Sequence, residues 1–214
     1  MKAETKRALC RHYEEYPKLQ LADLHKYIYQ SAFGCEHLLS NEEKVIEYIK
    51  EEAANCRPHL GEMVEALDGG YCRVYLDWLQ KGLSPQTLGK LFVMSACHEE
   101  DGVRVLEEKL EALFELISAG ELPFEYEEAK KAADNWKKQG YPACRHSEVF
   151  REHYGPAYRV IKKEYAVFLP LLAEIDTRLQ SGQSVVTVDE SSVGDKKMLK
   201  KLLSDIYGGT VFCN

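Results

Sequence analysis

Residues 106–120 read LEEKLEALFELISAG and indicate the fold class of this chain. Apolar side chains recur in this stretch at intervals of three or four positions, so an α-helix would place them all on one face. Gly120 then ends the pattern, as a glycine just beyond the last helical residue commonly does. The stretch therefore predicts a long amphipathic helix that packs against other elements.

The same kind of pattern extends outward in both directions. Helices are predicted at about residues 2–16, 21–34, 40–53, 84–96, 124–139, 147–154 and 157–180. Ser84 followed by Pro85 is a helix start, because serine caps a helix and proline fits its first position. Pro170 is expected to kink the last helix. For residues 71–79 we favour helix over strand. The prediction is a mainly α fold, with a multi-helix orthogonal domain over residues 1–180.

The composition restricts the class of protein. The 214 residues include 45% hydrophobic and 29% charged residues, which is enough for a core and a solvated surface. A net charge of −7 argues against nucleic-acid binding, which requires a basic surface. The first residues lack an apolar signal core, and the longest apolar run, 166–175, is too short to span a membrane. We therefore expect a cytoplasmic protein that binds neither nucleic acid nor membrane and keeps its seven cysteines as thiols.

The sequence changes character after a linker at residues 181–184. Residues 185–188 read VVTV and predict a short β-strand, an element that the preceding domain is expected to lack. Residues 194–207 form an amphipathic helical pattern, and residues 210–213 predict a second strand. The segment 184–214 is thus a short C-terminal βαβ appendage. Two strands make a poor sheet alone, so we expect the appendage to dock on the helical domain or to pair with the strands of a second copy in a homodimer.

This appendage resembles the beginning of the uridine kinase family of P-loop nucleoside kinases. The resemblance rests on VVTVDESSVGDKKML at residues 185–199 and YGGTVF at residues 207–212, which follow the family's order of strand, phosphate-binding loop, helix and second strand. In the family the loop reads G-x-x-x-x-G-K-[ST], and its glycines let backbone N–H groups surround the phosphates.

The loop itself departs from the family pattern. Glu190 and Asp195 stand where the family has glycine, and Lys197 replaces the hydroxyl residue that holds magnesium. The carboxylate of Asp195 can cap the following helix and would repel an incoming phosphate. The resemblance therefore implies that this chain is not a competent kinase and that it needs no cofactor. The degenerate P-loop comprises Glu190, Val193, Gly194, Asp195, Lys196 and Lys197.

The helical domain also resembles uncharacterised bacterial proteins in which such a domain precedes a uridine kinase-like domain. The stretches that carry this likeness are SAFGCEHLL at residues 31–39, CRVYL at residues 72–76, GYP at residues 140–142, HSE at residues 146–148 and YGPAYR at residues 154–159. The likeness supplies no known chemistry.

Polar residues of the helical domain suggest a site for a small anionic ligand. Arginine suits bidentate contacts with phosphate or carboxylate, and two facing histidines would allow acid–base chemistry. The alternative, which we favour, is that these arginines pair with glutamates on surface helices. The candidate residues are His37, Arg73, His146, Arg151, Tyr158 and Arg159.

Cysteine and histidine occur close together at two places that deserve consideration as a zinc site. The weak candidates for ligands are Cys35, His37, Cys144 and His146. A C-x-H spacing is poor for structural zinc, and the chain contains no C-x-x-C motif. We therefore expect no metal.

Three functions follow from these observations. The first is a non-catalytic or regulatory helical module that binds a nucleotide-like or phosphorylated small molecule. The second is an independent enzyme that uses His37 and His146 in a polar cleft. The third is an interaction protein whose kinase-like segment serves as a dimerisation handle. We favour the first.

Overall fold

A computed structural model describes residues 2–34, 42–59, 61–95, 100–183 and 194–208. Most of these residues are helical, which confirms the predicted mainly α fold. Within the described ranges, no helix is both long enough and apolar enough to cross a bilayer. The elements are α1 (Lys2–Glu15), α2 (Leu21–Phe33), α3 (Glu42–Asn55), β1 (Val64–Ala66), β2 (Tyr71–Tyr75), the 3₁₀ helix η2 (Leu76–Lys81), α4 (Pro85–Met94), α5 (Glu100–Ser118), α6 (Tyr126–Lys138), α7 (Glu148–Tyr154), β3 (Tyr158–Lys162), α8 (Lys163–Ala166), α9 (Leu169–Gln180) and α10 (Lys196–Tyr207).

Helix ends follow local signals in the sequence. Ser84 accepts a hydrogen bond from the backbone N–H of Thr87 at 3.0 Å, and Pro85 is the first residue of α4. Gly120 follows α5 with a φ of 72°, a conformation that glycine adopts without steric cost. These starts and stops were predicted because each depends on neighbouring residues alone.

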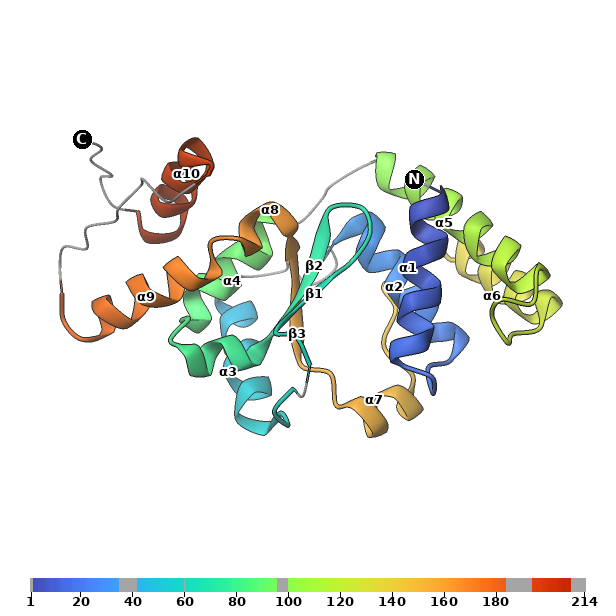
Figure 1. Ribbon diagram of the computed structural model, residues 1–214, viewed down its shortest axis with the longest axis horizontal. Helices are drawn as coiled ribbons and strands as arrows, with labels where there is room; N and C mark the ends of the chain where they lie inside the picture. Colours follow the sequence, from blue (N-terminus) through green and yellow to red (C-terminus); the bar gives the residue numbers. More distant parts are fainter. Residues whose placement is uncertain (1, 35–41, 60, 96–99, 184–193, 209–214) are drawn as a thin grey trace.

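A small antiparallel sheet stands at the centre of the molecule, with strand order β1-β2-β3. All five residues of β2 are buried. Tyr71 and Tyr75 face one hydrophobic cluster, whereas Cys72 and Val74 face another, as the alternation of side chains along a strand requires. Figure 1 shows the consequence: α1, α2, α5 and α6 lie on one side of the sheet, and α3, α4, α9 and α10 on the other.

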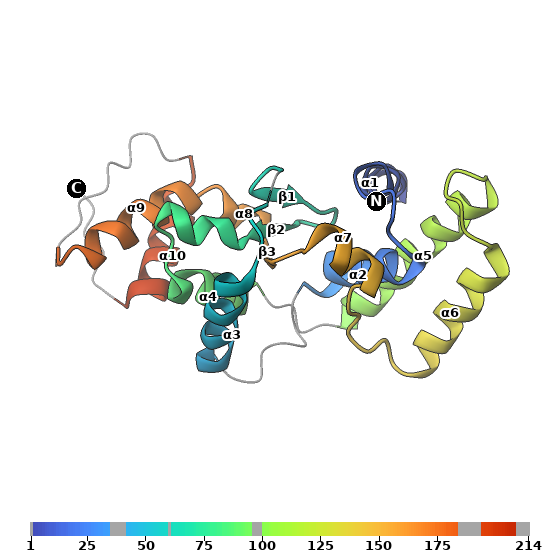
Figure 2. The ribbon, with the colours of Figure 1, turned by 90° about the horizontal axis from the view of Figure 1, so that it is seen from below.

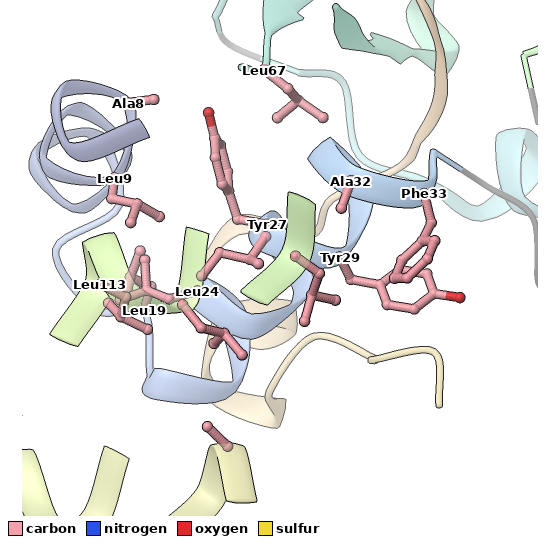
Figure 3. Close-up of a cluster of buried hydrophobic side chains, with 14 of the residues drawn as sticks. Ala8, Leu9, Leu19, Leu24, Tyr27, Tyr29, Ala32, Phe33, Leu67 and Leu113 are labelled. Atoms are coloured by element: carbon pink, nitrogen blue, oxygen red, sulfur yellow. The ribbon is translucent and has the colours of Figure 1, made fainter. Parts of the chain in front are cut away.

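The first cluster packs α1, α2 and α5 together beside the sheet. Leu9, Leu24 and Leu113 come from these three helices and are fully buried, with the ring of Tyr27 beside them. Figure 3 shows Leu9, Leu24 and Leu113 among the side chains of this cluster. Burying one such side chain contributes about 1.5 to 3 kcal/mol, so this cluster holds α2 firmly in position.

The second cluster includes the C-terminal helix. Leu199, Leu202 and Ile206 of α10 are buried against α4, beside which α10 lies in Figure 2. The hydroxyl of Tyr207 donates to Asp176 of α9 at 2.9 Å. The helix of the appendage therefore docks on the helical domain, as one of the two predicted arrangements requires. The predicted strands at 185–188 and 210–213, and hence pairing with a second copy, lie outside the described residues.

The prediction of helix for residues 71–79 was wrong in its first half. Residues 71–75 form β2, and helix begins only at Leu76. The β-branched and aromatic residues of this stretch favour a strand, and β3 supplies its hydrogen-bonding partner with Arg73 opposite Val160. The expectation that the domain lacks strands was therefore also wrong, since β3, which pairs with β2, lies far from it in the sequence.

The predicted helix at 157–180 is divided into three elements. Residues 158–162 form β3, residues 163–166 form the single-turn helix α8, and α9 begins at Leu169. Ile161, Tyr165 and Phe168 are nevertheless buried in one cluster, which explains why their spacing suggested a single helix. Pro170 lies in the first turn of α9, where a missing N–H costs nothing, and it therefore causes no kink.

Candidate functional site

A buried cation lies at the centre of the sheet. Arg73 on β2 is fully buried, and its Nη1 donates to the two carboxylate oxygens of Glu65 on β1 at 3.1 and 3.2 Å. Its Nε and Nη2 donate to Oε1 of Gln30 on α2 at 3.2 and 3.0 Å. Burial lowers the pKa of Arg73, but Glu65 raises it above its usual value. Burial raises the pKa of Glu65, but Arg73 holds it well below its usual range. Both groups are therefore charged at neutral pH.

A chain of hydrogen bonds leads from Arg73 to a buried carboxylate. Nε2 of Gln30 donates to the Tyr158 hydroxyl at 3.2 Å, and this hydroxyl lies 2.6 Å from Nε2 of His146. Nδ1 of His146 lies 2.9 Å from Oδ1 of Asp23. An ionised Asp23 can only accept, so Nδ1 of His146 carries its proton and Nε2 accepts from Tyr158. Each bond then has one donor and one acceptor, and His146 is neutral with both ring nitrogens occupied.

The pKa values at the far end of this chain agree with that assignment. Burial lowers the pKa of His146 to about 3, despite the opposing effect of Asp23. Burial raises the pKa of Asp23, but hydrogen bonds from His146, Ser147 and the backbone of Gln20 bring it down to about 2. The backbone N–H and the hydroxyl of Ser147 donate to Asp23 at 2.9 and 2.7 Å. Asp23 thus joins the start of α2 to the segment before α7.

A cleft of about 670 Å³ lies alongside this network, between α2, α3 and residues 155–160. Its volume falls within the range of pockets that hold small molecules, about 300 to 1,000 Å³. The polar side chains on its wall come from four parts of the chain: Lys26, Gln30, Tyr48, Glu51, Glu52, Asn55, His146, Tyr158 and Arg159.

Two cations on the cleft wall have different partners. Nη1 of Arg159 on β3 lies 2.6 Å from a carboxylate oxygen of Glu52 on α3 and donates to the Tyr158 carbonyl at 2.9 Å. Nζ of Lys26 on α2 donates to the backbone carbonyl of Cys144 at 3.3 Å. Among the described residues, Lys26 has no carboxylate within ion-pair distance. Burial, aided by the charge of Arg73, lowers the pKa of Lys26 to about 8.

The structure brings together three of the residues predicted from sequence. His146, Tyr158 and Arg159 line the cleft. Arg73 lies behind Tyr158, with its guanidinium carbon 4.8 Å from that ring's centre. Arg151 is exposed on α7 and pairs loosely, at 3.9 Å, with a neighbouring glutamate. Only Arg151 therefore meets the alternative of an arginine that pairs with a glutamate on a surface helix, since Arg73 pairs with Glu65 on β1 and Arg159 with Glu52 across the cleft wall.

Sequence reasoning missed Lys26, Gln30 and Glu52. Lys26 and Gln30 are polar residues beside and within residues 27–33 of α2, all of which are buried. Polar residues that interrupt a largely apolar stretch were a usable signal in the sequence. Lys26 and Gln30 are four residues apart and therefore share one helix face. Glu52 gave no such signal, because it lies among other glutamates of α3 and only the fold places it beside β3.

The candidate zinc ligands are only partly covered by the described residues. Cys35 and His37 lie outside them, and with them the predicted facing of two histidines. Cys144 bonds locally, its thiol 3.8 Å from the Pro142 carbonyl, and both nitrogens of His146 are engaged within the protein. Across the described ranges, no group of three or more histidine, cysteine or acidic residues could hold a metal ion.

The described part of the degenerate P-loop begins at Gly194. Oδ1 of Asp195 accepts a hydrogen bond from the backbone N–H of Met198 at 2.9 Å, so Asp195 caps α10 as predicted. Lys196 and Lys197 are exposed in the first turn of that helix. Glu190 and Val193 lie outside the described residues.

Comparison with known proteins supplies no relative. No family model, curated protein or solved structure matches this chain. The likeness of the appendage to uridine kinases is therefore a prediction from sequence, and a function has to be inferred from the geometry and charge of the cleft.

Proposed function

We propose that this protein is a non-catalytic or regulatory module that binds a small phosphorylated, nucleotide-like molecule in the cleft between α2, α3 and β3. The observation that carries the proposal is Lys26, a partly buried cation on the cleft wall that has no carboxylate partner among the described residues. A buried charge without a counter-ion is costly. An anionic group of a ligand would remove that cost.

Arg159 supplies a second contact for the same anion. The hydrogen bonds described for its guanidinium use Nη1 alone, which leaves Nε and Nη2 as donors. Arginine presents its N–H groups as a planar fork that matches two oxygens of a phosphate or carboxylate. Lys26 and Arg159 come from different elements, so both reach a ligand only if it occupies the cleft.

An aromatic ring on the cleft wall favours a ligand that carries a flat ring. Tyr48 of α3 lines the cleft and is 60% exposed, an unusual exposure for a large aromatic residue. Aromatic side chains of this kind stack on nucleobases with little regard to their sequence. A base against Tyr48 and a phosphate near Lys26 is the arrangement that we propose.

Thermal denaturation with uridine monophosphate, uridine and inorganic phosphate tests this function. Saturation at about a hundred times Kd stabilises the folded state by about 2.7 kcal/mol, which corresponds to a rise in Tm of about 5 to 10 °C for a chain of this size. We expect this rise with uridine monophosphate, a smaller rise with phosphate and little with uridine.

Variants show whether the ligand occupies this cleft. Lys26→Met should abolish the rise in Tm measured against that variant's own baseline. Lys50→Met is the matched control, because Lys50 lies exposed on α3 away from the cleft wall and should leave the rise unchanged. Absence of any rise in the unaltered protein, or the same rise in both variants, would disprove the proposal.

Catalysis by a pair of histidines has less support. Both ring nitrogens of His146 are bonded within the protein, to Asp23 and to Tyr158. A general base needs a free nitrogen within reach of its substrate, and His146 has none in this arrangement.

A further inference from the structure

Lys26 is the one lysine among the described residues that line the cleft, and none of those residues places a carboxylate within ion-pair distance of its amine. Its hydrogen bond goes to a neutral backbone carbonyl, that of Cys144. A lysine desolvated beside other cations is the usual form of an amine that attacks carbonyl groups. Such an amine becomes a nucleophile once it loses one proton.

The charged and titratable groups around Lys26 act in both directions. Arg73 on β2 opposes its protonation, whereas Cys144 before α7, Asp23 on its own helix and Glu52 on α3 favour it. Burial has the largest effect and lowers the pKa to about 8, from the usual 10.5. At neutral pH the neutral amine is then about 300 times more abundant than for an ordinary lysine.

We propose that the ligand carries an aldehyde or ketone group as well as its anion, and that Lys26 Nζ condenses with this carbonyl to form an imine. The inference rests on the proposed binding of an anion in the same cleft. The nitrogen lone pair attacks the carbonyl carbon and forms a carbinolamine. The C–O bond then breaks, both protons of the neutral amine leave with the oxygen as water, and a C=N bond remains. The step needs no oxidant and no reductant.

The chemistry places two further demands on the cleft. Loss of water from a carbinolamine requires a proton on the departing oxygen, and because the Tyr158 hydroxyl already donates its proton to His146, water that enters the cleft has to supply it. Arg159 can hold the anionic end of the molecule, which brings the carbonyl near Lys26 and raises its effective concentration.

Reductive trapping tests the inference on the whole protein. Pyridoxal phosphate, an aldehyde with a phosphate group, is added at one equivalent with cyanoborohydride at pH 7, and the labelled lysines are identified by peptide mass spectrometry. Pyridoxal, which lacks the phosphate, is the second probe. Lys50 in the same chain is the internal reference.

We expect pyridoxal phosphate to label Lys26 about tenfold faster than Lys50 or more. This ratio of rates is smaller than the ratio of neutral amines, because a less basic amine is also less nucleophilic. Labelling of Lys26 should level off above about pH 8, where its amine is already largely neutral. Excess inorganic phosphate, or the Arg159→Met variant, should slow labelling of Lys26 and leave Lys50 unaffected. Competition by inorganic phosphate tests whether an anion binds beside Lys26 even if Arg159→Met does not fold.

The outcomes separate this inference from the proposed function. Equal labelling of Lys26 and Lys50 overturns imine formation, whereas a thermal shift with uridine monophosphate that depends on Lys26 would still support anion binding. Equal labelling of Lys26 by both probes overturns the anionic carbonyl compound as the ligand class. Fast, phosphate-sensitive labelling of Lys26 supports the inference in full.

Discussion

Replacing Asp23 by asparagine should lower the free energy of unfolding substantially, because Asp23 accepts every hydrogen bond that holds residues 146–147 to α2. Its pKa falls from an ordinary 3.8 to about 2, which corresponds to about 2 kcal/mol of stabilisation. Asparagine has only one accepting oxygen, and its amide nitrogen is a donor. That nitrogen would face another donor, from Gln20, His146 or Ser147. Leaving one donor unpaired costs about 1 to 3 kcal/mol. We expect a total loss of about 2 to 4 kcal/mol.

The pH dependence of this loss gives a sharper test. The folded-state pKa of Asp23 lies below its unfolded value, so its stabilisation is complete above about pH 4 and disappears as the pH falls toward 2. Asparagine does not titrate. The difference in unfolding free energy between the two proteins should therefore be constant between about pH 5 and 8 and should shrink below about pH 4. Urea denaturation followed by circular dichroism measures it.

Asp134→Asn is the matched control for this experiment. Asp134 is exposed on α6 and lies 3.8 Å from Lys130, a contact worth little at a surface. We expect a change within about 0.5 kcal/mol. If Asp23→Asn has an equally small effect at pH 7, or if its effect does not depend on acidity, then Asp23 does not hold the segment before α7 as argued.

Three further changes have definite expected results. Lys26→Met should stabilise the unliganded protein by about 1 to 2 kcal/mol at pH 7, because only the unaltered chain contains an amine whose pKa is lowered by folding. This gain should vanish as the pH rises from about 8 to 10.5. Lower stability of the variant in a urea titration would contradict the prediction. Glu65→Gln should cost about 3 to 5 kcal/mol by leaving Arg73 charged and buried, and a change below about 1 kcal/mol in the same titration would argue against the pair. Asp195→Ala should cost about 0.5 to 2 kcal/mol, because the cap of α10 is lost. Hydrogen exchange should show faster exchange of amides in α10 alone. Unchanged exchange in α10 would refute the role of the cap.

The candidate site could be predicted only in part. The sequence singled out His146, Tyr158 and Arg159 by residue type, and the fold places all three on the cleft wall. It grouped Arg73 with them, although Arg73 is buried behind Tyr158. The hydrogen bond of Lys26 could not be predicted, because its acceptor is a backbone carbonyl 118 positions away, at Cys144, and a backbone group leaves no trace in a sequence.

The sequence by itself determined most of the helices, several of their ends and the cap of α10. Each of these depends on groups within about one helical turn, such as Ser84 with Thr87 or Asp195 with Met198. Local chemistry is sufficient there, because the donor and its acceptor are close neighbours along the chain.

Tertiary structure decided the sheet, the buried network and the cleft. β2 and β3 are separated by more than eighty residues, and each is a strand because the other supplies its hydrogen bonds and because helices cover both faces. The lowered pKa of Lys26 likewise results from its surroundings, since burial and the charge of Arg73 both oppose its protonation. Long-range pairing and desolvation depend on the position of every element at once, so no local pattern determines them.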